Sequence, residues 1–139
     1  MADTVTALIN GANPTVAGTS YSTVYATNSE RDFAIGCFLP TTTGAGTDTL
    51  VFSVEESDQQ DFADAERIRT CLLTAPDGTT SSTFTTIVGG TASPNAILQQ
   101  KWNLRDVNYN RFLRVKQVIT NTATSFTDVT VLLFSNARV

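Results

Sequence analysis

The chain has 139 residues, which suits a single domain, and it carries 13 acidic against 9 basic residues for a formal net charge of −4. This acidic balance argues against nucleic-acid binding through the overall field, and the apolar runs fall far short of the roughly 20 residues of a membrane helix. Because the chain contains no histidine, serine and cysteine nucleophiles lack their usual base and zinc lacks a usual ligand.

The chain is poor in charged residues and rich in threonine. Charged residues make up only 16% of the chain, and there are 24 threonines. Threonine is β-branched and suits a pleated, half-hydrated surface, so the composition favours an all-β protein. The N-terminus lacks a basic segment followed by a long apolar one, so we expect synthesis in the cytosol.

The first sixteen residues hold no aromatic side chain and contain the sequence Asn-Gly-Ala-Asn-Pro. Two alternatives remain for residues 1–16. They form either an edge strand, at 3–10, or an extended arm that becomes ordered on a neighbour. Residues 17–139 are expected to form one β-sandwich domain.

Period-2 alternation and β-branched or aromatic enrichment predict eight further strands. They lie at 18–27, 32–39, 48–56, 67–74, 83–88, 96–104, 110–120 and 125–135. The intervening segments 40–48, 75–82 and 89–95 have the composition of loops, and the only helical candidate is a turn or two at 59–67. Strands at this spacing without crossover helices predict an antiparallel two-sheet β-sandwich, jelly-roll-like in preference to immunoglobulin-like.

The two cysteines, Cys37 and Cys71, each sit in an apolar stretch. We predict two buried thiols in preference to a disulfide, because the cytosol is reducing.

Six acidic residues crowd the stretch 54–68, VEESDQQDFADAERI. It lacks the glycine and the ligand spacing of an EF-hand, and acids on one surface loop do not suggest a glycosidase cleft. A looser calcium site is the alternative to a solvated turn, which we expect to be capped by Ser57 or Asp58 and held to the sandwich by Phe62. We predict no cofactor and no catalytic residue.

Basic and aromatic residues mix near the C-terminal end of the chain. Three interpretations remain for them: an outward strand face with a buried tryptophan, a protein–protein surface, or a single-stranded nucleic-acid site, the last disfavoured by the acidic total. The candidate partner-contact residues are Trp102, Arg105, Tyr109, Arg111 and Arg114.

Two segments resemble small structural proteins of tailed-phage virions. Residues 49–64 show an alternating strand, then Glu-Ser-Asp, an aromatic residue and Asp, and residues 109–134 resemble the C-terminal hairpin of those proteins. The resemblance implies a non-enzymatic cement or decoration protein on the outside of the capsid. Its partner would be the major capsid protein, and it would assemble as a homo-oligomer, dimer or trimer. The alternatives are a tail or neck component and a carbohydrate- or receptor-binding sandwich.

Overall fold

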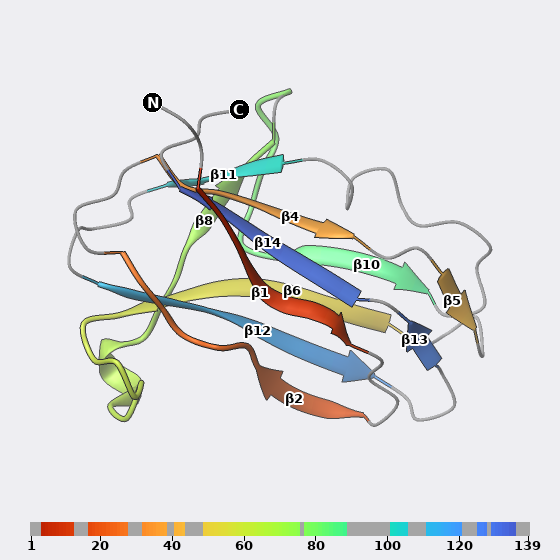
Figure 1. Cartoon of the computed structure of the whole chain (residues 1–139), viewed down its shortest axis with the longest axis horizontal. Coiled ribbons are helices and arrows are strands. Elements are labelled where there is room, and N and C mark those ends of the chain that lie inside the picture. The colour runs from red at the N-terminus through yellow and green to blue at the C-terminus, as the bar shows by residue number, and fades with distance from the viewer. Residues whose placement is uncertain are drawn as a thin grey trace.

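The computed structural model describes residues 4–12, 17–27, 32–38, 41–43, 49–75, 77–88, 101–105, 111–120, 125–127 and 129–135. In this part of the chain the strands form two antiparallel sheets packed as a sandwich (Figure 1), so the predicted all-β architecture is confirmed. None of the helical structure within these residues is long and apolar enough to cross a membrane.

The first sheet has the strand order β1-β14-β4-β11-β8-β9. Its strands are β1 (Thr4–Ala12), β14 (Val129–Ser135), β4 (Ala34–Phe38), β11 (Lys101–Arg105), β8 (Leu72–Thr74) and β9 (Thr80–Ser81). Strand β1 lies at one end of this order and pairs antiparallel with β14. The described part of the N-terminal segment is therefore an edge strand of the sandwich.

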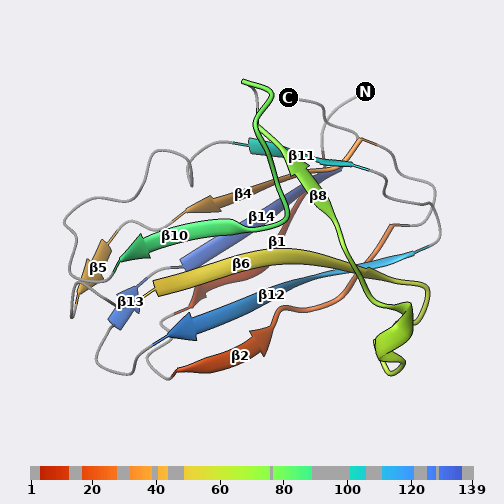
Figure 2. The ribbon, with the colours of Figure 1, turned by 180° about the vertical axis from the view of Figure 1, so that it is seen from behind.

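The second sheet has the order β10-β6-β12-β2, with β3 also pairing with β12 and β7 with β6. Its strands are β10 (Phe84–Val88), β6 (Thr49–Ser57), β12 (Phe112–Thr120), β2 (Gly18–Tyr21), β3 (Tyr25–Ala26) and β7 (Arg69–Thr70). Two short strands, β5 (Thr41–Thr43) and β13 (Ser125–Thr127), pair separately at one end of the molecule (Figure 2).

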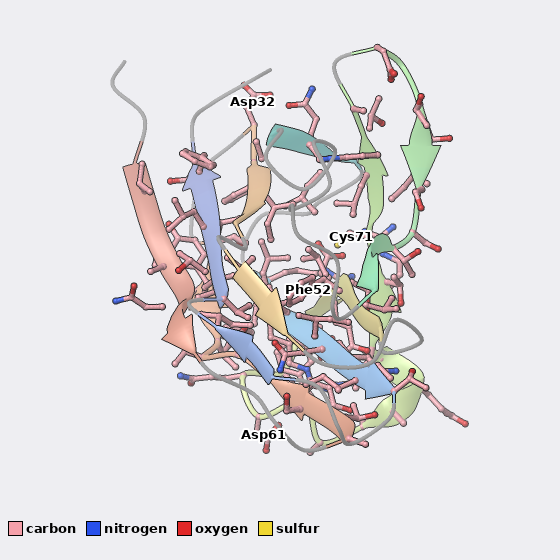
Figure 3. The ribbon with its side chains drawn as sticks, turned by 90° about the vertical axis from the view of Figure 1, so that its right-hand side faces the viewer. Asp32, Phe52, Asp61 and Cys71 are labelled. Carbon is pink, nitrogen blue, oxygen red and sulfur yellow. The ribbon has the colours of Figure 1, made fainter. Side chains whose placement is uncertain are left out.

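The nine-residue pair of β6 and β12 is the centre of the second sheet. All nine residues of each strand are in register, from the pair of Phe112 with Ser57 to the pair of Thr120 with Thr49. Alternate side chains face the first sheet, and Figure 3 shows one of them, Phe52, in the interior of the sandwich. These inner positions are fully buried at Leu50, Phe52, Val54, Leu113 and Val115. Each such side chain contributes roughly 1.5–3 kcal/mol through removal of its apolar surface from water.

The strand predicted at 67–74 changes sheets half-way. Arg69 and Thr70 pair with β6 in the second sheet, whereas Leu72–Thr74 pairs with β11 in the first. Between them, the backbone N–H of Cys71 donates to the carbonyl of Val54 at 2.8 Å. The Cys71 side chain is buried as predicted, and the side chain of Cys37 lies outside the described residues. Strands that switch sheets in this way form the corners of a sandwich.

The strand predicted at 18–27 is also interrupted. The Ser22 hydroxyl accepts a hydrogen bond from the backbone N–H of Val115 at 2.8 Å, in a position where a main-chain carbonyl would serve in a regular ladder. Five residues on, the Thr27 hydroxyl accepts from the N–H of Arg111 at 3.0 Å. Small hydroxyl side chains that compete with the backbone in this way break β2 from β3.

Two of the predicted loops contain short strands, and those predictions were wrong in part. Strand β5 lies within 40–48 and β9 lies within 75–82. The turn before β9 is closed by a hydrogen bond from the N–H of Gly78 to the carbonyl of Ala75, and Gly78 has a φ of 91°, which glycine adopts without strain. The backbone N–H and hydroxyl of Thr79 hold the pKa of Asp77 below its usual value.

Gln117 of β12 places a polar side chain among the buried inner positions. Its Nε2 donates to Ser20 Oγ at 3.2 Å, while its Oε1 is buried and accepts no hydrogen bond within the described part of the chain. A buried polar atom left unpaired costs about 1–3 kcal/mol, whereas the exposed Ser20 hydroxyl can bond to water.

Replacing Gln117 with methionine, which has a similar shape, should therefore raise the free energy of unfolding by about 1 kcal/mol. Urea denaturation followed by tryptophan fluorescence measures the change. Gln117→Glu is the control, since a buried carboxylate at this position should instead destabilise the fold. A methionine variant less stable than the parent would mean that Oε1 has a partner in solution.

Candidate functional site

The five candidate partner-contact residues do not form one surface. Trp102 lies in β11 of the first sheet, and Arg105 ends the same strand opposite Leu72, with its side chain outside the described residues. Tyr109 is also outside the described residues. Arg111 immediately precedes β12 of the second sheet, and Arg114 lies near the start of that strand.

Trp102 is part of the core. Its side chain is 4% exposed, and in β11 it lies opposite Ile35 of β4. This placement matches the packing interpretation of the aromatic residues, in which the tryptophan is buried. The role of the five residues in partner contact stays a prediction, and in this conformation the Trp102 ring is not at the surface to take part in it.

Arg114 is held from three sides. Its Nε donates to Glu55 Oε1 at 2.9 Å, directly across the β6–β12 register. Its guanidinium carbon lies 3.7 Å from the centre of the Tyr21 ring and 4.1 Å from the centre of the Phe62 ring. The carboxylate and arginine side chains are only 9% and 14% exposed. A guanidinium over an aromatic face contributes about 0.5–2 kcal/mol. Through these contacts Arg114 links β2, β6 and the acidic loop, residues 58–64.

Glu56 forms a second ion-pair cluster on the other face of β6. Its side chain is fully buried, and its Oε1 lies 2.6 Å from Nη2 of Arg69 and 3.9 Å from Nε of Arg111. A buried carboxylate is tolerated only when cations and hydrogen-bond donors replace its water. Glu56 thus joins the end of the core to β7 and to the residue that precedes β12.

Removal of one partner from this cluster should be costly. We expect Arg69→Met to lower the free energy of unfolding by about 2 kcal/mol, because Glu56 stays buried with Arg111 as its more distant cation. The cost is below that of a fully buried pair, since the Arg69 side chain is 46% exposed. Denaturant unfolding measures it, with the exposed Arg67→Met as the control at below about 1 kcal/mol. Equal losses in the two variants would contradict this assignment.

The acidic stretch is largely a capped turn, as predicted. Ser57 Oγ accepts from the N–H of Gln59, and Phe62, with a φ of 50°, is buried against the sandwich. Asp64 caps the 3-10 turn Ala65–Arg67 by accepting from the N–H of Glu66 at 3.0 Å. Figure 3 shows Asp61 at the outer end of this loop.

The expectation that the whole acidic stretch is solvated was wrong for Glu55 and Glu56. Both belong to β6 and both are buried, because arginines from β12 and β7 stand opposite them. The sequence indicates one of these pairings: when the strands 48–56 and 110–120 are aligned antiparallel, Glu55 can be placed opposite Arg114. The two rings that Arg114 contacts, those of Tyr21 and Phe62, come from distant segments, and no pattern in the sequence indicates these contacts.

Most carboxylates of the acidic stretch make contacts within the fold. The carboxylates of Asp61 and Asp64 accept hydrogen bonds from backbone N–H groups, and those of Glu55, Glu56 and Asp58 pair with arginines. Among the described residues, no three His, Cys, Asp or Glu side chains are grouped so that they could hold a metal ion. In comparisons with known proteins, no protein family, curated protein or solved structure matches the chain.

Proposed function

We propose that the protein is a non-enzymatic structural component of a tailed-phage virion, a cement protein that binds the outside of the assembled head and has the major capsid protein as its partner. The observation that carries the proposal is the order of the strands. The resemblance of residues 49–64 and 109–134 to virion proteins supports it independently.

The strand order supports a jelly roll, which is the finer fold that we propose. The eight principal strands, taken along the chain, are β1, β2, β4, β6, β10, β11, β12 and β14. Successive strands of this set lie in different sheets except for β6 and β10, which pair with each other, and β1-β14-β4-β11 faces β2-β12-β6-β10. In this order the first strand pairs with the last, as in the two interlocked Greek keys of a jelly roll, and the segment β7–β9 is an insertion. Viral capsid and lectin domains commonly use this architecture.

The described aromatic residues favour the capsid role over the lectin role. A sugar platform needs an open aromatic face, but the chain's single tryptophan is buried in β11. Tyr21 is half exposed, yet one face of its ring is covered by the Arg114 guanidinium. The rings of Trp102 and Tyr21 therefore support core packing and a cation–π contact in preference to a sugar platform.

A cement protein stabilises a capsid by mass action. It binds the assembled lattice and not the separate subunits, so it shifts the equilibrium away from disassembly. Contacts to two or more capsomers add avidity, and a stable contact buries on the order of 1,600 Å² in total. A rigid sandwich suits this task, because little conformational entropy is lost when it binds.

The test uses heads of the phage that encodes this chain, prepared without it. The purified protein should bind these heads to saturation, fail to bind unassembled capsid subunits, and raise the temperature at which the heads release DNA. Electron microscopy of the particle should then place it on the head. Density at the neck or tail, or heads equally heat-resistant with and without the protein, would overturn the proposal.

A further inference from the structure

The N-terminal part of the chain carries no charge over a long stretch. Between Asp3 and Glu30 lie 26 consecutive residues without Asp, Glu, Lys or Arg, although 22 of the 139 residues in the chain (9 + 13) are charged. At that overall frequency about four charges would be expected in such a stretch. The described part of it comprises β1, β2, β3 and residues that connect them.

This uncharged stretch supplies edge strands to both sheets. Strand β1 ends the first sheet and β2 ends the second. A hydrogen bond of 3.4 Å from Thr23 Oγ1 to the carbonyl of Leu8 joins the two edges, so they lie beside one another along one side of the sandwich. In Figure 3, β1 forms the left margin of the ribbon. We call this side, made of residues 4–12 and 17–27, the uncharged edge.

Most of the exposed apolar bulk gathers on the uncharged edge. Four large apolar side chains among the described residues are exposed, and three of them, Val5, Tyr21 and Val24, belong to it. The fourth, Leu72, is in β8, towards the opposite end of the first sheet. Natural proteins often protect sheet edges with charged side chains, especially lysine, or with proline. Strands β1 and β2 contain neither a charged residue nor a proline.

We propose that the uncharged edge is an interface between two copies of this chain. A protein with a net charge of −4 associates with itself most readily through a surface that lacks the like charge. Recognition of a charged partner would instead be expected to place complementary charges on this edge. A second copy presents the same uncharged edge, so the two surfaces meet without like-charge repulsion and without an unpaired charge.

A single two-fold axis can satisfy both edges. An axis perpendicular to the sheets places β1 antiparallel to the β1 of a second copy and, in the other layer, β2 antiparallel to its counterpart. Both sheets then continue across the dimer.

The regular part of β1 sets where the pairing occurs. Its register with β14 is unbroken from Thr4 to Ala7 and shifts twice between Ala7 and Ala12. Bulges twist an edge away from a neighbouring strand, so Thr4–Ala7 is the segment suited to pairing. Val5, 53% exposed, lies within it.

The experiment measures mass as a function of concentration by sedimentation equilibrium on the full chain. The parent protein is expected to be a dimer that dissociates on dilution. The double variant Val5→Lys, Thr19→Lys places like charges on both edges, and it should raise the dimer dissociation constant at least about tenfold. The matched control is Leu72→Lys, which changes another exposed apolar residue, 42% exposed and outside the uncharged edge, and should leave the constant unchanged.

Hydrogen exchange on the parent protein provides a second measurement that needs no variant. Amides of Thr4–Ala7 and Gly18–Tyr21 should exchange more slowly at high protein concentration than at low concentration. A parent chain that stays monomeric at millimolar concentration, or a Leu72→Lys variant that dissociates as readily as the double variant, would overturn the proposal. Concentration-independent exchange at these two strands would also overturn it.

Discussion

Replacing Arg114 with methionine is expected to lower the free energy of unfolding by about 3 kcal/mol. Methionine keeps much of the apolar stem but removes the guanidinium. Glu55, whose side chain is only 9% exposed, then loses the hydrogen bond of 2.9 Å that Arg114 donates. The contacts with the rings of Tyr21 and Phe62 are lost in the same step. Denaturant unfolding of the two proteins gives the difference directly.

Two further variants separate these contributions. Lys116→Met alters the next outward-facing position of the same strand, where we expect a change within about 0.5 kcal/mol. Glu55→Gln, combined with Arg114→Met in a double-mutant cycle, should show a coupling energy of about 1–3 kcal/mol. Additive effects of the two substitutions would show that Arg114 acts through its ring contacts alone.

The loss should also be visible locally. Tyr21 lies in β2 and Phe62 in the acidic loop, so Arg114 ties an edge strand and a loop to the centre of the second sheet. Segments with few other anchors open first when such a contact is removed. Faster hydrogen exchange at 18–27 and 58–64 in the Arg114 variant, with 113–119 changed less, is the expected pattern.

The sequence predicted the fold better than the contacts, for a physical reason. Alternation in 48–56 and 110–120 reports which side chains face a core, and those two segments became β6 and β12 within two residues at each end. Alternation does not report which sheet a strand joins. The change of sheet at Cys71 and the break at Ser22 could therefore not be predicted, because they depend on hydrogen bonds to distant residues that alternation does not indicate.

The candidate site illustrates the same limit. Trp102, Arg111 and Arg114 are close in sequence, but β11 belongs to the first sheet and β12 to the second, so the tryptophan was separated from the arginines. Conversely, Glu55 and Arg114 are 59 residues apart and make one of the best-buried ion pairs. Only the antiparallel register of β6 and β12 brings them together, and a register is fixed by the whole sheet.

Trp102→Ala is the second substitution for which we expect a large effect, about 4 kcal/mol of lost stability. The side chain is 4% exposed, and its removal leaves a cavity between β11 and the second sheet that a close-packed interior fills only in part. Thermal and denaturant unfolding measure the loss. Trp102→Phe is the matched control, which keeps an aromatic ring in place and should cost about 1–2 kcal/mol.

The same pair of variants distinguishes packing from partner contact. If Trp102 acts only in the core, Trp102→Phe should bind phage heads and self-associate like the parent chain at temperatures well below its unfolding midpoint. If the tryptophan itself contacts a partner, that variant should lose binding while it remains folded. Because the buried ring lies in the sheet opposite Arg111 and Arg114, we expect the first result. A folded Trp102→Phe protein that no longer binds would mean that β11 moves outward on the partner, and that the sandwich is less rigid than its packing implies.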